Sequence, residues 1–246
     1  MSDYFHIKKS QMNVLKNTPL YCQAKDQSYV LYKRAGESLQ DLRVAEEKHP
    51  ELFVHKKDKD AAEKELFETL NHLLARQCLS NDLNNIRSTL YLIVKEALQH
   101  EDGGGLKYLP ETVDIMFAMY SKETRFLDVL TKIGNISDII VEHTINVMLL
   151  TFRYCFHQNL PEKETKHLAL CALVHDVGIS KINKDLIEAD RRLTDEEFQS
   201  YAQHTVFGHD IIKNEAGLDA SIARVSVEHH ERIDGSGYPK GKTNIS

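Results

Sequence analysis

The sequence contains no tryptophan, only five prolines, and no apolar run that approaches the ~20 residues needed to span a bilayer. Its N-terminus lacks the basic and then apolar layout of a signal peptide. The formal net charge of −6 leaves no excess of basic residues for a general nucleic-acid-binding face. We therefore expect a cytoplasmic globular protein that has neither a membrane nor a nucleic acid as a partner.

Cysteine is also scarce, and its spacing excludes a disulfide framework or a Cys-x-x-Cys site. The four cysteines are scattered along the chain, which is typical of reduced thiols in a cytoplasmic protein: Cys22, Cys78, Cys155 and Cys171. By contrast, the chain has 13 histidines, most of them in its C-terminal half. With 246 residues and 41% hydrophobic content, it can bury one large core or two unequal ones.

Residues 1–58 are predicted to form a small α+β domain. The runs 21–24 and 29–33 are rich in β-prone residues, and the polar residues between them suit a hairpin turn. A short helix is expected over 38–47, and 52–55 offers another strand. No catalytic constellation occurs in this region, so we expect a regulatory or partner-binding role for it.

Helical periodicity begins near residue 59. Residues 59–105 are predicted to form a helical linker whose apolar stripe packs within the chain, although a coiled-coil seam between protomers would give the same pattern. The glycines at 103–105 mark a flexible break. Residues 106–246 need no strand, so the fold class is α+β overall, with an all-α bundle after the small domain.

Several helices are expected inside 106–246. Thr194 and Glu197 have the spacing of a capping box, and Asp219 can cap the last helix. The predicted helices cover about 110–121, 122–133, 137–156, 161–174, 194–213 and 219–228.

The most informative stretch is 229–239, which reads His-His-Glu-Arg-Ile-Asp-Gly-Ser-Gly-Tyr-Pro. Neighbouring side chains on a helix point about 100° apart, so His229 and His230 cannot both face an apolar core. At a helix end beside a cleft, both can converge on one metal centre. The glycines free the backbone, and Pro239 stiffens the exit. A polar turn after a surface helix is the alternative, which the length of the string disfavours.

Upstream histidines and one aspartate complete a candidate metal site. The further donors are His143, His204 and the doublet His175–Asp176. Nitrogen and carboxylate donors suit Fe, Mn, Co or Zn and exclude an iron–sulfur cluster. Asp176 can bridge two ions because a carboxylate has two oxygens, whereas a neutral imidazole offers one lone pair. Two ions about 3.5–4 Å apart would activate water and neutralise phosphate charge, which suits phosphoester hydrolysis.

The stretch 229–239, with Gly-Tyr-Pro at 237–239, and the doublet His175–Asp176 together resemble the signature of HD-GYP domains, a branch of the HD metallophosphohydrolases. The resemblance covers the C-terminal half of the chain and implies an HD-type helical bundle. It implies that Asp176 bridges two metals held by the imidazoles of His143, His175, His204, His229 and His230. It also implies that the loop residues shape the substrate cleft, and we name Gly235, Gly237, Tyr238 and Pro239 as substrate-binding.

The function implied by the resemblance is hydrolysis of cyclic di-GMP, or of a related cyclic dinucleotide, by a metal-bridging hydroxide. Two divalent metal ions, Fe or Mn, are the expected cofactors, and signalling proteins are possible partners of the N-terminal domain. A non-catalytic receptor or scaffold with the same ligands is the alternative. A generic HD enzyme acting on another nucleotide would explain the doublet but would leave the loop motif unexplained.

Three departures from the family pattern bear on these expectations. The family usually has a lysine after the glycine that follows the doublet, whereas Ile179 stands here, so we assign the catalytic role to Lys181 together with Asp176. Some members hold a third metal with a glutamate before the first histidine. That position is Ile139 here, and Glu142 is expected to face elsewhere, which favours two metals. The family also continues beyond the loop, so the domain is expected to be incomplete at its C-terminus.

Other polar residues near the motif have competing interpretations. We prefer His204 to His209 as the ligand after the doublet. Asp234 is expected to stabilise the turn and not to bind metal. For Glu231, orientation of a ligand histidine and simple exposure stay open. The remaining histidines of this region are expected to be solvated: His100, His157 and His167.

Overall fold

A computed structural model describes residues 2–39, 49–80, 82–98, 103–122, 139–214 and 218–243. The chain forms two compact units, Met1–Leu73 and Leu74–Ser246. Within the described ranges, no helix is both long and apolar enough to cross a bilayer. The predicted boundaries at residues 58 and 105 stay a prediction.

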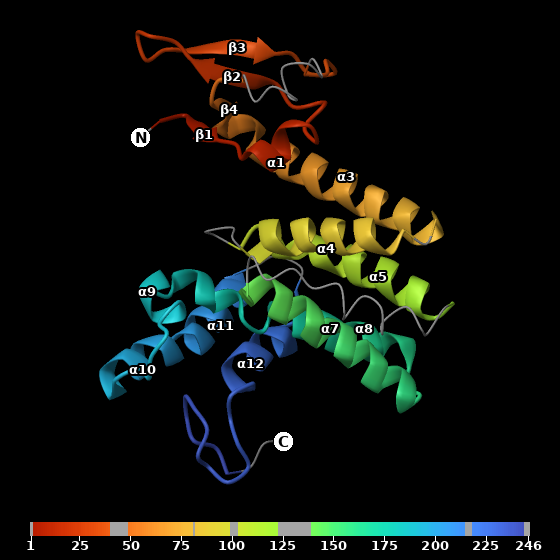
Figure 1. The fold of residues 1–246 in the computed structure, drawn as a ribbon, viewed down its shortest axis with the longest axis vertical. Coiled ribbons are helices and arrows are strands. Elements are labelled where there is room, and N and C mark those ends of the chain that lie inside the picture. The colour runs from red at the N-terminus through yellow and green to blue at the C-terminus, as the bar shows by residue number, and fades with distance from the viewer. Residues whose placement is uncertain are drawn as a thin grey trace. The chain divides into compact units, whose positions relative to one another are not determined.

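The first unit contains a four-stranded antiparallel sheet (Figure 1). Its order is β1-β4-β2-β3, with bounds Tyr4–His6, Leu52–His55, Leu20–Gln23 and Tyr29–Lys33. The expected hairpin and the strand over 52–55 are thus confirmed, while β1 and α1 (Lys9–Met12) were not predicted. The predicted helix over 38–47 lies almost wholly outside the described residues.

Apolar and aromatic side chains hold this sheet together, which explains why such short strands form. Ile7, Leu20 and Leu52 are almost completely buried. On the other face, Tyr4 stacks on Tyr29 with ring centroids 4.1 Å apart. Aromatic pairs of this kind stabilise cross-strand contacts beyond the area that they bury.

The second unit has no strand among its described residues, as predicted for the bundle. The helix α3 (Lys59–Ser80) runs from one unit into the other. The helices that follow are α4 (Leu83–Leu98), α5 (Leu109–Tyr120), α7 (Ile139–His157), α8 (Glu162–Val174), α9 (Lys184–Ile187), α10 (Asp195–Ala202), α11 (His204–Asn214) and α12 (Ala220–Glu228). Two short 3₁₀ turns join them, η2 (Leu106–Tyr108) and η3 (Val177–Lys181).

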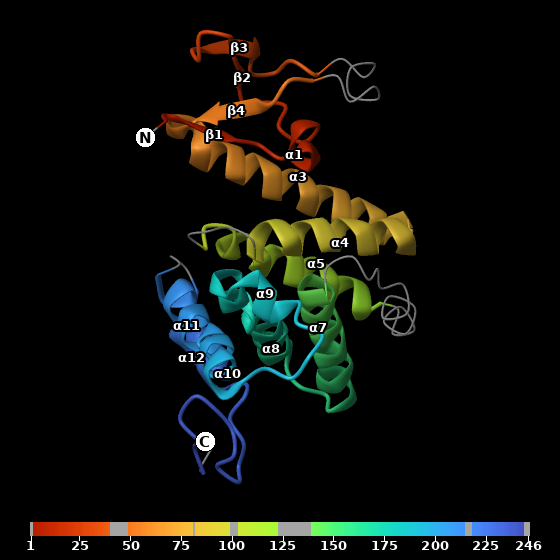
Figure 2. The same cartoon turned by 60° about the vertical axis from the view of Figure 1, so that its left-hand side comes forward.

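Helix packing in this unit brings distant parts of the chain together. In Figures 1 and 2, α7 lies along α8, and α11 lies along α12. The turn η3 packs against α11, so the residues that follow α8 meet the start of α11. The predicted helices over 110–121, 137–156, 161–174 and 219–228 correspond to α5, α7, α8 and α12, whereas 122–133 lies outside the described residues.

The single helix predicted over 194–213 is wrong, because it is divided into α10 and α11. The predicted capping box of Thr194 and Glu197 does start α10. The division has a local cause: the side chains of His204 and Thr205 bond to the carbonyls of Tyr201 and Ala202. Such bonds compete with the backbone ladder of a continuous helix. The break makes His204 the first residue of α11.

Candidate metal centre

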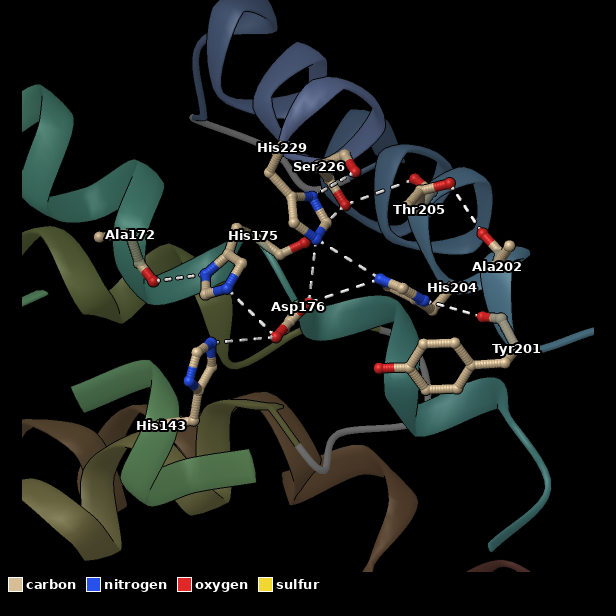
Figure 3. Close-up of polar contacts among 10 residues, drawn as sticks. All are labelled: His143, Ala172, His175, Asp176, Tyr201, Ala202, His204, Thr205, Ser226 and His229. Atoms are coloured by element: carbon tan, nitrogen blue, oxygen red, sulfur yellow. Dashed lines mark hydrogen bonds and ion pairs between the residues drawn. The ribbon is translucent and has the colours of Figure 1, made fainter. Parts of the chain in front are cut away.

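The predicted ligands lie at the ends of helices that meet inside the second unit. His175 follows the last residue of α8, and Asp176 precedes η3. His229 follows α12, while His143 lies near the start of α7. Figure 3 shows that His143 approaches Asp176 from one side, and that His204 and His229 approach from the other.

The two carboxylate oxygens of Asp176 face different histidines. Oδ2 lies 3.1 Å from Nε2 of His175 and 3.7 Å from Nε2 of His143. Oδ1 lies 3.2 Å from Nε2 of His229 and 3.5 Å from Nε2 of His204 (Figure 3). Asp176 therefore stands between two sets of imidazoles.

Backbone hydrogen bonds orient three of these rings. The Nδ1 atoms of His175, His204 and His229 lie 2.8, 2.8 and 2.9 Å from the carbonyl oxygens of Ala172, Tyr201 and Ser226. A carbonyl can only accept, so each Nδ1 carries the proton and donates it. In the neutral rings, each Nε2 then presents a lone pair towards Asp176, which is the tautomer that a metal requires.

The donors form two groups that suit cations. One group is His143, His175 and Asp176, and the other is Asp176, His204, His229 and His230; within each group the donor atoms lie within 4.8 Å of one another. Asp176 Oδ1 is buried, yet it receives no hydrogen bond of good geometry from the described residues. A buried acceptor surrounded by further acceptors is costly unless a cation joins them. The residues present thus fit the metal that the sequence implied, and the ligand assignment itself stays a prediction.

The electrostatics of the centre favour a charged carboxylate and act in opposite directions on the imidazoles. Burial would lower the pKa of His175, but the hydrogen bond and the charge of Asp176 outweigh it and raise that pKa. Burial alone would raise the pKa of Asp176, but the adjacent His175 and His229 outweigh it and hold that pKa well below its usual range. Burial lowers the pKa of His204 and, with its histidine neighbours, lowers the pKa of His230 to about 4. Unprotonated imidazoles are the form that binds metal.

A close contact of three backbone segments holds the ligand-bearing elements together. A Cβ on Gly178 would lie 1.9 Å from the carbonyl oxygen of His204, and a Cβ on Gly208 would lie 2.1 Å from Ser226 Oγ. Only glycine permits so close an approach of η3, α11 and α12. The buried Ser226 hydroxyl donates to the carbonyl of His175 at 2.8 Å.

Glu231 closes the loop after α12, so the interpretation that it is simply exposed is wrong, while orientation of a ligand histidine stays a prediction. Its carboxylate is buried and accepts the backbone N–H groups of Lys240 and Lys242 at 2.7 and 2.8 Å. Glu231 therefore fixes the shape of the loop. Asp234 stabilises the turn as predicted, because its Oδ1 accepts from the amide and the hydroxyl of Ser236 at 3.0 and 2.6 Å.

The four predicted substrate-binding residues lie on this loop, and Tyr238 contacts the imidazole of a predicted ligand. Tyr238 stacks on His230 with centroids 4.5 Å apart and an interplanar angle of 22°. Gly235 adopts a φ of 75°, which favours glycine, and Gly237 packs against the backbone of His230 too closely for a side chain. Pro239 follows Tyr238 through a cis peptide bond.

One residue beside the centre was missed at the sequence level. The Tyr201 ring lies with its centroid 5.0 Å from that of His204, and in Figure 3 its hydroxyl points towards the side on which Asp176 lies. Its place in the last turn of α10, one helical turn before a ligand, is a signal that could have found it.

Lys181, the second predicted catalytic residue, belongs to neither donor group. It ends η3 with an exposed side chain. Ile179, at the position where the resemblance implied a lysine, is buried with 6% of its surface exposed. That Lys181 fills the catalytic role of the lysine missing at position 179 therefore stays a prediction.

The remaining histidines of this region were not predicted to be metal ligands. His209 is half-buried beside Asp210 and lies outside both donor groups, in keeping with the preference for His204. His167 is half-exposed, and its Nε2 lies 3.2 Å from Ser221 Oγ and 3.7 Å from Cys171 Sγ, so the expectation that it is solvated stays a prediction. His157 ends α7, and His100 lies outside the described residues.

Glu142 turns away from the centre, as predicted. It pairs with Arg87 of α4, whose Nη2 also donates to Asn146 Oδ1 at 3.0 Å. Arg87 is almost completely buried, with 3% of its side chain exposed. This ion pair anchors α7 directly beside His143.

The region of the chain that contains these donors matches a known family. Residues 128–246 match the family model described as the HD domain. A cyclic di-GMP phosphodiesterase of Pseudomonas aeruginosa is 27% identical over 131 residues, which is 53% of this chain and 32% of the relative. A cyclic di-GMP phosphodiesterase of Thermotoga maritima is 27% identical over 161 residues, or 65% of this chain and 40% of the relative. The chain thus spans less than half the length of either.

Two further similarities extend beyond the HD domain region. A 3'3'-cGAMP-specific phosphodiesterase of Vibrio cholerae is 24% identical over 192 residues, which is 73% of this chain and 38% of that relative. The solved structure of Bd1817, an HDG"Y"P protein from Bdellovibrio bacteriovorus, aligns with a TM-score of 0.59 at 18% identity, covering 96% of this chain and 80% of that one. At this identity the structure supports the fold alone.

Proposed function

This chain belongs to the HD-GYP branch of the HD domain family, and from that premise we propose that it is a metal-dependent cyclic-dinucleotide phosphodiesterase. The observation that carries the proposal is the position of Asp176 between two sets of imidazoles. A carboxylate that can join two cations is what an enzyme needs to neutralise a phosphodiester.

The two donor groups would hold two divalent ions, with Fe or Mn as the expected metals. His143 and His175 would serve one ion, and His204, His229 and His230 the other, with Asp176 shared between them. Histidine nitrogen and carboxylate oxygen are suitable donors for these metals. When bound, the ions would supply positive charge to the phosphate and lower the pKa of the water that attacks it.

The chain's own residues prepare this chemistry in two ways. The Nδ1–H bonds to backbone carbonyls keep the Nε2 lone pairs of His175, His204 and His229 directed at the centre. The loop that Glu231 closes presents Tyr238 beside His230, at the edge of the same centre. A phosphodiester bound there would lie beside the Tyr238 ring.

Cyclic di-GMP is the proposed substrate, and 3'3'-cGAMP is the competing one, because relatives carry both names. A cyclic di-GMP receptor without catalysis is the second candidate function. It is favoured by one observation: Ile179 is buried and apolar where the resemblance implied a lysine. For residues 1–58 we propose a regulatory or partner-binding role.

The test combines metal analysis with hydrolysis of both dinucleotides by the purified full chain. We expect metal in the purified protein, turnover of cyclic di-GMP, and loss of turnover in Asp176→Asn. The matched control is His209→Ala, which removes a neighbouring histidine outside both donor groups. Binding of cyclic di-GMP at full metal content without any turnover would reject the enzyme and leave the receptor.

A further inference from the structure

The phenol of Tyr201 lies beside the candidate metal centre, although Tyr201 is not one of the predicted metal ligands. Its backbone carbonyl accepts the Nδ1–H of His204 at 2.8 Å, so the residue is fixed relative to a ligand. Its ring lies 5.0 Å from the His204 ring, centroid to centroid, and is half-buried. Figure 3 shows the hydroxyl directed away from the helix and towards the Asp176 side of the cluster.

The phenol can act as a donor at this position. A tyrosine hydroxyl has an ordinary pKa of about 10, so it is protonated at neutral pH and can donate a hydrogen bond.

Four of the predicted ligand side chains present the opposite polarity when their imidazoles are neutral. The Nε2 atoms of His175, His204 and His229 face the centre as acceptors, and Asp176 adds carboxylate oxygens. A phosphodiester brings only acceptor oxygens, so it needs donors in addition to cations. Ile179, next to the ligand doublet, is apolar and cannot supply one.

We propose that the Tyr201 hydroxyl donates a hydrogen bond to a phosphoryl oxygen of the substrate. The inference deepens the proposed function and rests on it, because it takes the bound group to be a phosphodiester. Tyr201 then recognises phosphate from the α10 side of the centre, while Tyr238 lines the loop side against His230. The hydroxyl supplies a hydrogen-bond donor for an oxyanion, whereas the Nε2 atoms of the imidazoles present acceptors.

The experiment compares wild type with Tyr201→Phe, which removes only the hydroxyl and keeps the ring and the carbonyl that orients His204. The affinity for inorganic phosphate is measured by calorimetry on the manganese-loaded full chain. We expect affinity about tenfold weaker in the variant, since hydrogen bonds to charged groups are among the stronger ones. Manganese content should be unchanged, and kcat/KM for the cyclic dinucleotide should fall by a similar factor.

Tyr154→Phe is the matched control, because this exposed tyrosine of α7 also loses only a hydroxyl. Equal phosphate affinity in wild type and Tyr201→Phe would overturn the inference, as would a wild type that binds no phosphate. A fall in manganese content would assign Tyr201 to the support of His204 instead. If wild type binds phosphate but hydrolyses no cyclic dinucleotide, the proposed function fails, and the phosphate affinities still decide the role of Tyr201.

Discussion

Ser226 Oγ donates a hydrogen bond to the backbone carbonyl of His175 at 2.8 Å, while the carbonyl of Ser226 accepts the Nδ1–H of His229 at 2.9 Å. One fully buried serine therefore joins α12 to the end of α8 and also orients a ligand. The carbonyl that it satisfies belongs to the residue directly before Asp176. The two donor groups are thus connected through hydrogen bonds of one residue, Ser226.

We predict that Ser226→Ala weakens manganese binding about tenfold, as is usual when a residue that supports a metal ligand is removed. In the variant, the backbone carbonyl of His175 loses the hydroxyl that donates to it. This loss should also lower the free energy of unfolding by about 1–3 kcal/mol. Metal titration and urea unfolding of the metal-free protein measure the two effects. Ser200→Ala is the control, since its hydroxyl also donates to a backbone carbonyl but is exposed. Unchanged manganese affinity in Ser226→Ala would remove the serine from the support of the centre.

A second prediction concerns the buried pair of Arg87 and Glu142. Both side chains are at most 10% exposed, and two other nitrogens of Arg87, Nε and Nη1, are buried without an acceptor among the described residues. Glu142→Gln leaves that cation uncompensated, so we expect unfolding to become easier by about 3 kcal/mol. The replacement Glu188→Gln breaks an exposed pair with Lys184 and should change the stability little.

The double variant Arg87→Met/Glu142→Met completes this test. Replacing a buried ion pair by apolar side chains is often close to neutral. We therefore expect the double variant to recover most of the stability that Glu142→Gln loses, as measured by urea unfolding. A double variant less stable than Glu142→Gln would mean that the pair holds α4 against α7 through its charges.

Local patterns in the sequence identified the features that depend on neighbouring residues. The capping residues Thr194 and Asp219 begin α10 and α12 because a cap bonds to amides only two or three residues away. The hairpin of β2 and β3 follows from two β-prone runs and the polar turn between them. The resemblance to a family supplied the residues of the centre, and composition alone would not have done so.

Features that depend on distant residues could not be predicted. The pair Arg87–Glu142 joins helices far apart in sequence, and nothing in either helix identifies the other. Glu231 was ambiguous because its partners, the amides of Lys240 and Lys242, exist only once the loop folds back. The end of α10 was missed because Tyr201 and His204 fit a helical period on both sides of the break.

The last prediction is that Asp176 holds two metal ions together. Asp176→Asn keeps the side-chain size but removes the negative charge that both donor groups share, so occupancy of both ions should fall. His143→Ala should mainly weaken the ion on the Oδ2 side, and His204→Ala the ion on the Oδ1 side. The metal-to-protein ratio of each variant, measured by elemental analysis after equal metal loading, provides the test.

The three variants together separate a shared ligand from two independent sites. If the two metal sites were independent, Asp176→Asn would lower the metal-to-protein ratio no more than His143→Ala or His204→Ala does. Because each oxygen of Asp176 faces a different set of imidazoles, we expect it to lower the ratio more than either His143→Ala or His204→Ala. His209→Ala should retain the wild-type ratio, since that ring lies outside both donor groups. Wild-type occupancy in Asp176→Asn would show that the imidazoles alone hold the metals, and the bridging role would then be wrong.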